Sequence, residues 1–188
     1  MIDTDWGYSV DELQPILSVN DFRLLCPGLS STDEQLAAVL EAVGASIRNY
    51  CGWHVSPVLE CTYVGEGDGD MLFLPAMGVK DVKSLEIDGV AVDNIEWKHT
   101  GIIRHHRFPD KFRSVTCVYD AGFSSESIGQ VVAQIASNAV VAAPGVANER
   151  AGDVSITYNQ TGTGITGGVS LLPRDYELLA PYKLARVW

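Results

Sequence analysis

Hydrophobic residues recur at helical spacing in the stretch that follows residue 31. A capping box precedes them, either Ser31 with Glu34 or Thr32 with Gln35, in which two side chains satisfy backbone N–H groups reciprocally. The pattern ends at Cys51-Gly52, where glycine supplies a left-handed cap. The apolar positions are Leu36, Val39, Leu40, Val43, Ile47 and Tyr50. The sequence therefore predicts a long amphipathic helix that ends at Cys51.

Two shorter helices are expected near the ends of the chain. One begins at Ser18 and stops near Cys26-Pro27-Gly28, and the other lies near Pro173–Ala180. Gly44 sits inside the long helix and costs about 1 kcal/mol there relative to alanine. Close contact with a neighbouring helix would explain this glycine.

A fourth helix is predicted from Ser127 onward by a broad apolar stripe. Its other face is polar but carries no charge, and no charged residue occurs from Ser127 to Asn148. A solvated helix face usually carries charged side chains. We therefore expect another helix or another subunit to cover this face. The polar residues are Gln130, Gln134, Ser137 and Asn138.

From Val55 to Phe123 the pattern changes to short strands separated by turn residues. Asp88-Gly89 is the strongest two-residue hairpin signal in the chain. In the last strand, alternate residues share one face, which we expect to be buried: Val115, Cys117 and Tyr119. The predicted strands are Val58–Val64, Met71–Leu74, Val82–Ile87, Val90–Trp97, Gly101–Arg104 and Arg113–Tyr119.

Two segments do not fit either pattern. Residues 1–17 hold three Asp, one Glu and no basic residue, which predicts a loose acidic arm. Residues 144–169 form a long Gly-rich segment interrupted by an alternating run, Val154–Tyr158. A loop of this length inside a compact domain is usually functional. The alternation predicts an extended hairpin.

Together these elements predict an α+β fold, in which a bundle of about four helices carries an inserted small antiparallel β-sheet or barrel. The acidic arm is 1–17. The helical core is built from 18–54 and 124–188, with the extended hairpin loop at about 148–169. The inserted strand-rich region is 55–123.

Composition narrows the class of protein. The 188 residues are 46% hydrophobic and 20% charged, with a formal charge of −11, so the chain can bury a core and is too weakly charged for a disordered acidic tail. A protein of this sign does not bind DNA tightly through its whole surface. The four cysteines, Cys26, Cys51, Cys61 and Cys117, have no C-x-x-C spacing and are expected to be free, mostly buried thiols. No signal peptide or membrane span is expected, which fits folding in the cytosol.

Candidate catalytic and metal-binding motifs are weak. The acidic segment Gly65–Asp70 could be a calcium loop, but the position of the bidentate glutamate is Met77, so a plain hairpin turn is favoured. Residues 104–113 form a basic patch that is either a solvated hairpin end or a site for an acidic partner or nucleic-acid backbone. The chain has no G-x-S-x-G, S-x-x-K or H-E-x-x-H motif. We expect no enzyme activity, no metal site and no cofactor.

Aromatic and apolar residues gather at the C-terminus: Tyr176, Leu179, Tyr182 and Trp188. They could pack against the chain's own core. A terminal tryptophan after Lys183 and Arg186 is more typical of an anchor in a partner's pocket, because such residues dominate interfaces.

The order of these elements resembles the head–tail connector, or adaptor, proteins of long-tailed bacteriophages. The most specific similarity pairs a Gly-Asp-x-Ser-x-Thr-Tyr loop with a closing helix and a Pro-Tyr-basic end. The inserted strands and the longer Gly-rich stretch at 160–168 are departures from smaller family members. The similar segments are Ser18–Leu25, Asp33–Gly52, Leu72–Pro75, Val82–Leu85, Val115–Phe123, Asn148–Tyr158 and Leu171–Lys183.

The resemblance implies a structural virion protein that is not an enzyme. Such a protein forms a ring, commonly of twelve copies, beneath the portal, extends the DNA channel without specific DNA binding, and offers a surface to the next connector or tail protein. It would be assembled in the host cytoplasm and reside at the head–tail interface. Portal contacts are expected from Tyr176, Leu179, Tyr182, Lys183, Arg186 and Trp188. Subunit contacts are expected from Gln130, Gln134, Arg150, Asp153, Ile156 and Tyr158.

Two other functions stay open on the sequence alone. One is a small-ligand or carbohydrate-binding module on the strand region, with Trp97 or Trp53 as a stacking platform. The other is a hydrolase around His105 and Asp110, which no motif supports.

Overall fold

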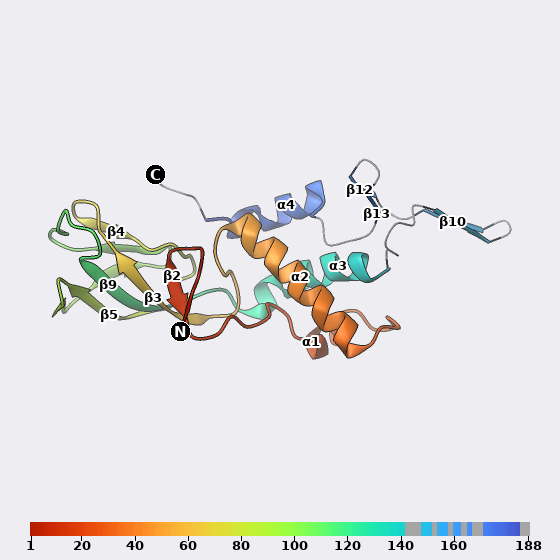
Figure 1. Ribbon diagram of the computed structural model, residues 1–188, viewed down its shortest axis with the longest axis horizontal. Coiled ribbons are helices and arrows are strands. Elements are labelled where there is room, and N and C mark those ends of the chain that lie inside the picture. Colours follow the sequence, from red (N-terminus) through yellow and green to blue (C-terminus); the bar gives the residue numbers. More distant parts are fainter. Residues whose placement is uncertain (142–147, 152–153, 158–159, 163–164, 167–170, 185–188) are drawn as a thin grey trace. The chain divides into compact units, whose positions relative to one another are not determined.

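A computed structural model describes residues 1–141, 148–151, 154–157, 160–162, 165–166 and 171–184. The chain divides into two compact units (Figure 1). The strand unit contains Met1–Gln14, Cys51–Ser124 and Tyr182–Trp188, and the helical unit contains Pro15–Tyr50 and Ser125–Pro181. The architecture is α+β, as the sequence predicts, because helices and antiparallel sheets occupy separate parts of the chain.

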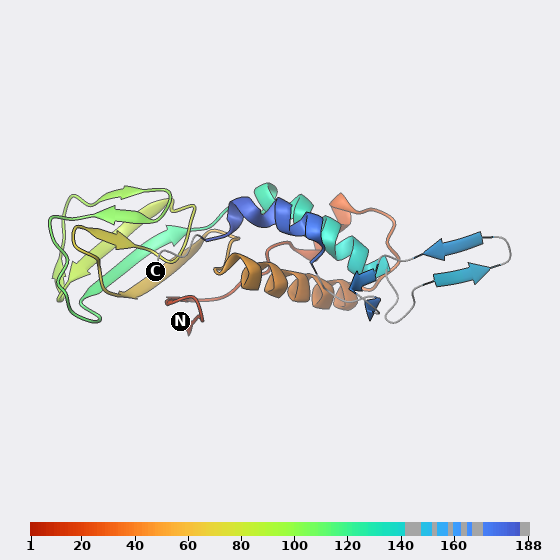
Figure 2. The same ribbon diagram turned by 90° about the horizontal axis from the view of Figure 1, so that it is seen from above.

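Each helix of the helical unit buries one apolar face. Helix α3 contacts both α1 and α4, and Figures 1 and 2 show α4 lying beside α3. The helices are α1 (Val19–Leu25), α2 (Asp33–Cys51), α3 (Ser125–Val141) and α4 (Pro173–Leu179), the last followed by a 3₁₀ turn, Ala180–Tyr182. The buried residues include Phe22, Leu36, Leu40, Val43, Ile47, Ile128, Val132, Ile135, Ala136 and Leu179. No helix in the described ranges is both long and apolar enough to cross a membrane.

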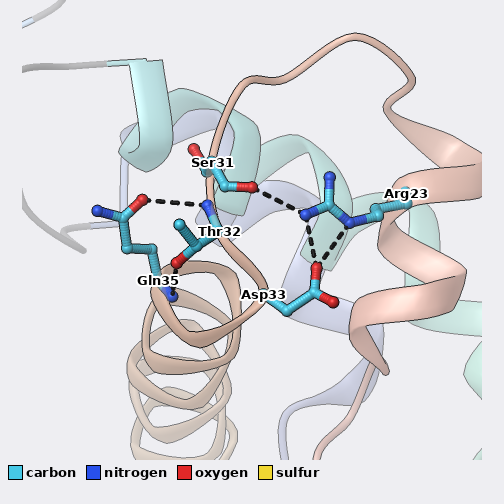
Figure 3. Close-up of polar contacts among 5 residues, drawn as sticks. All are labelled: Arg23, Ser31, Thr32, Asp33 and Gln35. Atoms are coloured by element: carbon cyan, nitrogen blue, oxygen red, sulfur yellow. Dashed lines mark hydrogen bonds and ion pairs between the residues drawn. The ribbon is translucent and has the colours of Figure 1, made fainter.

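Side-chain hydrogen bonds fix the connection between α1 and α2 (Figure 3). Of the two possible capping boxes, Thr32 and Gln35 form the observed one: the Gln35 N–H donates to Thr32 Oγ1 over 3.3 Å, and the Thr32 N–H donates to Gln35 Oε1 over 3.2 Å. The Arg23 guanidinium donates to Asp33 Oδ1 over 2.6 and 2.9 Å, and to the Ser31 carbonyl over 2.8 Å. The start of α2 is therefore tied to the end of α1.

Gly44 does not mark a helix–helix contact, so this expectation is wrong. The nearest atoms to a Cβ placed on Gly44 belong to the Ile16 side chain, at 3.8 and 3.9 Å. Ile16 lies in the segment before α1, and these distances are ordinary van der Waals contact. The position therefore has room for a methyl group.

The strand unit contains two antiparallel sheets. The larger has the strand order β1-β2-β3-β9-β5-β6, and the smaller has the order β4-β8-β7. In β9 alternate residues from Val115 to Ala121 are buried, which confirms the predicted inward face. The strands are β1 (Ile2–Asp3), β2 (Tyr8–Val10), β3 (Leu59–Gly65), β4 (Met71–Phe73), β5 (Asp81–Ile87), β6 (Val90–Ala91), β7 (Glu96–Lys98), β8 (Ile102–Arg104) and β9 (Val115–Ala121).

The predicted Asp88-Gly89 hairpin joins β5 to β6, and both turn residues have positive φ, 48° and 77°. The predicted partner strand over 90–97 is divided, however. β6 ends at Ala91, and β7 pairs with β8 in the smaller sheet. A second turn explains the division, because Asn94 between them has a φ of 55°, which an uninterrupted strand cannot accommodate.

The loose arm predicted over 1–17 is wrong for its first ten residues and for Ile16 and Leu17, which are buried. β2 pairs with β3, with Tyr8 opposite Tyr63 and Val10 opposite Cys61. Tyr8 and Val10 are both buried. The sequence does not predict β2 because the strand has only two alternating apolar residues, Tyr8 and Val10, within an acidic segment.

Strands β10 (Asn148–Ala151) and β11 (Val154–Thr157) pair as an antiparallel hairpin. A second hairpin, which the sequence pattern does not predict, pairs β12 (Gln160–Gly162) with β13 (Ile165–Thr166). Each hairpin is a two-stranded sheet of its own within the described residues. Every strand of the two hairpins therefore keeps one edge without a strand partner there.

Candidate functional site

Helix α4 presents the first of the predicted C-terminal contact residues. Pro173 starts the helix, and the carboxylate of Asp175 accepts the Leu172 N–H over 2.8 Å, so a backbone donor at the helix start is satisfied. Tyr176 is 41% exposed, and its ring centroid lies 4.8 Å from that of Tyr50 in α2. Tyr176 is therefore held by one aromatic contact and still offers surface to a partner.

Leu179 is fully buried inside the helical unit, with an exposed fraction of 0%. Its side chain holds α4 against its own unit, and in this structure it offers no surface to a portal protein. Its assignment as a portal-binding residue is therefore wrong. Helical spacing from Tyr176 places Leu179 on one face of α4, but it does not tell whether a residue of that face contacts a partner or the protomer's own core.

The segment after α4 is fastened to the strand unit at two backbone positions. The Trp53 indole N–H donates to the Tyr182 carbonyl over 2.7 Å, and the Leu184 N–H donates to the Cys51 carbonyl over 2.9 Å. The Tyr182 ring meets the Phe123 ring edge-on, with centroids 5.2 Å apart. Residues 182–184 are therefore fixed, and Lys183 between them is exposed. Arg186 and Trp188 lie outside the described residues.

Trp53 and Phe123 were not recognised from the sequence as supports for the C-terminal segment. Trp53 has an exposed fraction of 0% and packs edge-on against Phe123 with centroids 5.7 Å apart. Its interpretation as a stacking platform for a ligand is therefore wrong. Trp97 lies in β7 with intermediate exposure. A tryptophan next to a helix end gives no sequence signal that its N–H will meet a carbonyl more than a hundred residues away.

The outer face of α3 carries the predicted subunit-contact residues Gln130 and Gln134. Both are exposed, as are Ser127 and Asn138 on the same face. No charged residue of α3 follows Glu126. An uncharged polar face of this kind can approach another protein surface without the cost of stripping water from charges.

The remaining predicted subunit contacts fall in or beside the β10–β11 hairpin. Arg150 lies in β10 opposite Ser155, and Ile156 lies in β11 opposite Glu149. Asp153 and Tyr158 lie outside the described residues. The free edges of this hairpin are the geometry that strand addition from another chain requires.

The predicted basic patch over 104–113 is partly neutralised. Arg104 pairs with Asp70 over 3.2 Å, and Lys111 pairs with Asp88 over 2.6 Å. The His105 ring lies 5.6 Å from that of Phe108. The ion pairs remove part of the positive potential that a nucleic-acid backbone would need.

Three cysteines line the interior and have altered acidity. Burial raises the pKa of Cys117 to about 12, and burial together with the nearby Asp120 and Glu60 raises that of Cys61 to about 12. Burial also raises the pKa of Cys51 to about 12, against a smaller lowering by Lys183. All four cysteines are free, and Cys26 is the one with intermediate exposure. The three buried thiols are therefore unreactive near neutral pH.

The fold has counterparts among solved structures. A chain from the neck of a native gene transfer agent particle, computed with C12 symmetry, superimposes with a TM-score of 0.58 at 17% identity, covering 96% of this chain and 97% of that one. A chain from the neck of the empty particle, computed with C6 symmetry, gives 0.56 at 17% identity, and one from the native virion gives 0.58 at 16% identity, each with the same coverage. No protein-family model and no curated protein matches the sequence. The chain therefore has the fold of a neck protein of such a particle.

Proposed function

We propose that this chain is a structural protein of the neck of a phage-like particle, where copies close into a ring between the capsid portal and the tail or next connector. The observation that carries the proposal is that the similarity to neck chains covers 96% of this chain, both units included. The C12 symmetry given for one of those necks supports a ring of twelve copies. Such a protein works by binding its neighbours in the particle and by forming a ring, and it is not an enzyme.

The charge of the chain suits a channel for DNA. At −11 per protomer, a ring presents a strongly acidic wall, on which phosphate groups find few cations to bind. Double-stranded DNA can then pass without specific contact, because like charges keep it from adhering.

Ring closure would use the surfaces that the protomer leaves open. The uncharged α3 face, with Gln130 and Gln134, packs on the adjacent copy. The β10–β11 hairpin, with Arg150 and Ile156, adds strand contacts, and Asp153 and Tyr158 remain proposed contact residues. These surfaces lie within the helical unit, which leaves the strand unit for contacts with other partners.

Portal binding would use the C-terminal segment, through Tyr176, Tyr182, Lys183, Arg186 and Trp188. Trp53 and Phe123 hold residues 182–184 in place, so the contact residues beyond them start from a fixed point. Pre-organisation of this kind lowers the entropic cost of binding.

The experiment removes residues 185–188 and leaves Leu184 in place. A deletion from 181 onward would also break the hydrogen bonds to Trp53 and Cys51, and would confuse loss of fold with loss of binding. Full-length and shortened chains are mixed with portal-bearing, tail-less particles and sedimented. We expect the full chain to co-sediment and the shortened chain to remain in solution with an unchanged circular dichroism spectrum. Equal binding by both chains would show that the portal contact lies elsewhere, and no binding by the full chain would refute the neck role.

A further inference from the structure

A pocket of about 360 Å³ lies in the strand unit, outside the surfaces proposed above for ring closure and portal binding, and it overlaps the basic patch 104–113. It is built by the connection from β3 to β4, by Phe73 at the end of β4, and by the segment between β8 and β9. Its lining combines two phenyl rings with three carboxylates and one lysine. The lining residues are Glu66, Gly67, Asp68, Phe73, Asp110, Lys111 and Phe112.

Glycine allows the first loop to fold closely against its surroundings. A Cβ on Gly67 would overlap the ring of Phe108, which is buried directly beside the loop. A Cβ on Gly65 would likewise overlap the Tyr63 side chain. Packing against two aromatic rings therefore explains the glycines at positions 65 and 67 of the segment that resembled a calcium loop.

Hydrogen bonds then hold the loop in one conformation. Asp68 and Met71 exchange two backbone bonds of 2.7 and 2.9 Å, and the Phe108 N–H donates to the Gly69 carbonyl over 2.8 Å. Tyr63 Oη donates to the Glu66 carbonyl and accepts the Glu66 N–H, over 3.1 and 3.2 Å. The pocket is thus formed before any ligand arrives, which favours binding.

The two phenyl rings at the pocket are unusually exposed. Phe112 is 83% exposed and Phe73 is 40% exposed. Large apolar side chains that gather on a surface mark contact with another molecule. Both rings therefore present apolar surface to a partner, Phe112 with most of its side chain and Phe73 with less than half.

The carboxylates of the pocket have no cationic partner within the part of the chain that the structure describes. Glu66, Asp68 and Asp110 form no ion pair there, while Lys111 is already paired with Asp88. Arg107 and Arg113 lie in the same loop but do not line the pocket. The lining therefore carries an excess of negative charge. The described residues contain no cluster able to hold a metal ion.

We infer that this pocket docks an arginine side chain presented by another protein. A guanidinium group stacks on phenyl faces through the cation–π interaction and donates paired hydrogen bonds to carboxylates, and the pocket supplies both kinds of group. The inference does not depend on ring formation, because every residue involved belongs to the strand unit of one protomer.

The test titrates the full chain with N-acetylarginine amide and follows backbone amide signals by NMR. N-acetylcitrulline amide is the matched control, since it has the same shape without the charge. We expect saturable shifts confined to the two pocket loops with the arginine compound and none with the citrulline compound. Shifts of equal size with both compounds, shifts scattered over the surface, or no saturable shift would overturn the inference.

Two variants locate the site. Phe112→Ala removes the more exposed ring, and Asp110→Asn removes one charge, so each should weaken binding about two- to fivefold. Asp81→Asn is the control, because Asp81 is an exposed carboxylate of β5 that does not line the pocket. The exposure of Phe112 means that its loss leaves the fold intact. Unchanged affinity in both pocket variants would also overturn the assignment.

Discussion

Trp53 shows how a single side chain can have two roles within the strand unit. Its ring fills the core of the strand unit, while its N–H holds the Tyr182 carbonyl at 2.7 Å. Trp53 is fully buried, and a buried N–H without a partner costs about 1–3 kcal/mol, so this hydrogen bond helps to hold the C-terminal segment in place. The sequence reveals an aromatic residue at this position, but the carbonyl it meets is set by tertiary structure alone.

Two glycines should respond to alanine in opposite directions. Gly44 sits in α2 with room for a methyl group, so Gly44→Ala should raise the free energy of unfolding by about 0.5–1 kcal/mol through helix propensity. Gly67→Ala forces a Cβ into the Phe108 ring and should lower it by about 1–3 kcal/mol. Urea denaturation followed by circular dichroism measures both. A Gly67→Ala protein as stable as the wild type would refute the packing of Phe108 against this loop.

The buried thiols predict loss of stability in alkali. The pKa of Cys117 rises from 9.0 to about 12 because burial penalises the thiolate. The folded state therefore keeps the proton while the unfolded chain loses it above pH 9, so the stabilising effect is complete below pH 9 and declines as pH rises toward 12.

We expect Cys117→Ala to reduce this alkaline loss. Between about pH 8 and about pH 11, the free energy of unfolding should fall by on the order of 1–3 kcal/mol less in the variant than in the wild type. Urea titrations at the two pH values give the difference directly. Parallel losses in the two proteins would mean that Cys117 ionises equally in the folded and unfolded states.

Among the elements, α3 carries the most specific prediction. Gln134→Glu places one negative charge per copy on the face proposed to meet the adjacent subunit, and repulsion should weaken assembly on portal-bearing particles about tenfold, or 1.4 kcal/mol. Asn20→Asp adds the same charge to an exposed position of α1 and serves as the control. Co-sedimentation measures assembly, and thermal unfolding should change little in either variant. Assembly that tolerates Gln134→Glu as well as Asn20→Asp would exclude this face from the subunit contact.

The sequence predicts the long elements because several independent signals in each of them indicate the same structure. α2 has a capping box, six apolar positions at helical spacing and a glycine stop, and β9 alternates over seven residues. The sequence does not predict β1 and β2, because strands of two and three residues are too short to show an alternating pattern. The division of 90–97 between two sheets was missed because it depends on the backbone of Asn94.

The candidate surfaces, like the helices and strands, can be predicted only where they extend over many consecutive residues. The uncharged face of α3 is visible in the sequence, since the absence of charge over many residues is itself a pattern. The pocket is not, because Phe73 and Phe112 are far apart in sequence and Gly67 and Phe108 meet only after folding. Leu179 shows the converse: a helical aromatic and apolar stripe looks like a docking surface until burial assigns one member to the core.

For the molecule as a whole, the fold and the proposed role stand on different observations. The α+β architecture follows from the elements themselves. The proposed role as a neck component rests on a fold similarity that spans nearly the entire chain at 17% identity. It also rests on an acidic protomer that has an uncharged helix face and, within the described residues, unpaired strand edges. Copies that close around a channel would bury those surfaces and leave the acidic charge facing DNA.

Electron microscopy of tail-less, portal-bearing particles incubated with the purified chain tests this role most directly. We expect averaged images of the portal vertex to gain a closed ring of twelve copies, coaxial with the portal and open at its centre. The chain without residues 185–188 serves as the control and should add no such ring. A vertex that gains no density with the full chain, or gains isolated single copies in place of a ring, would contradict the proposed function.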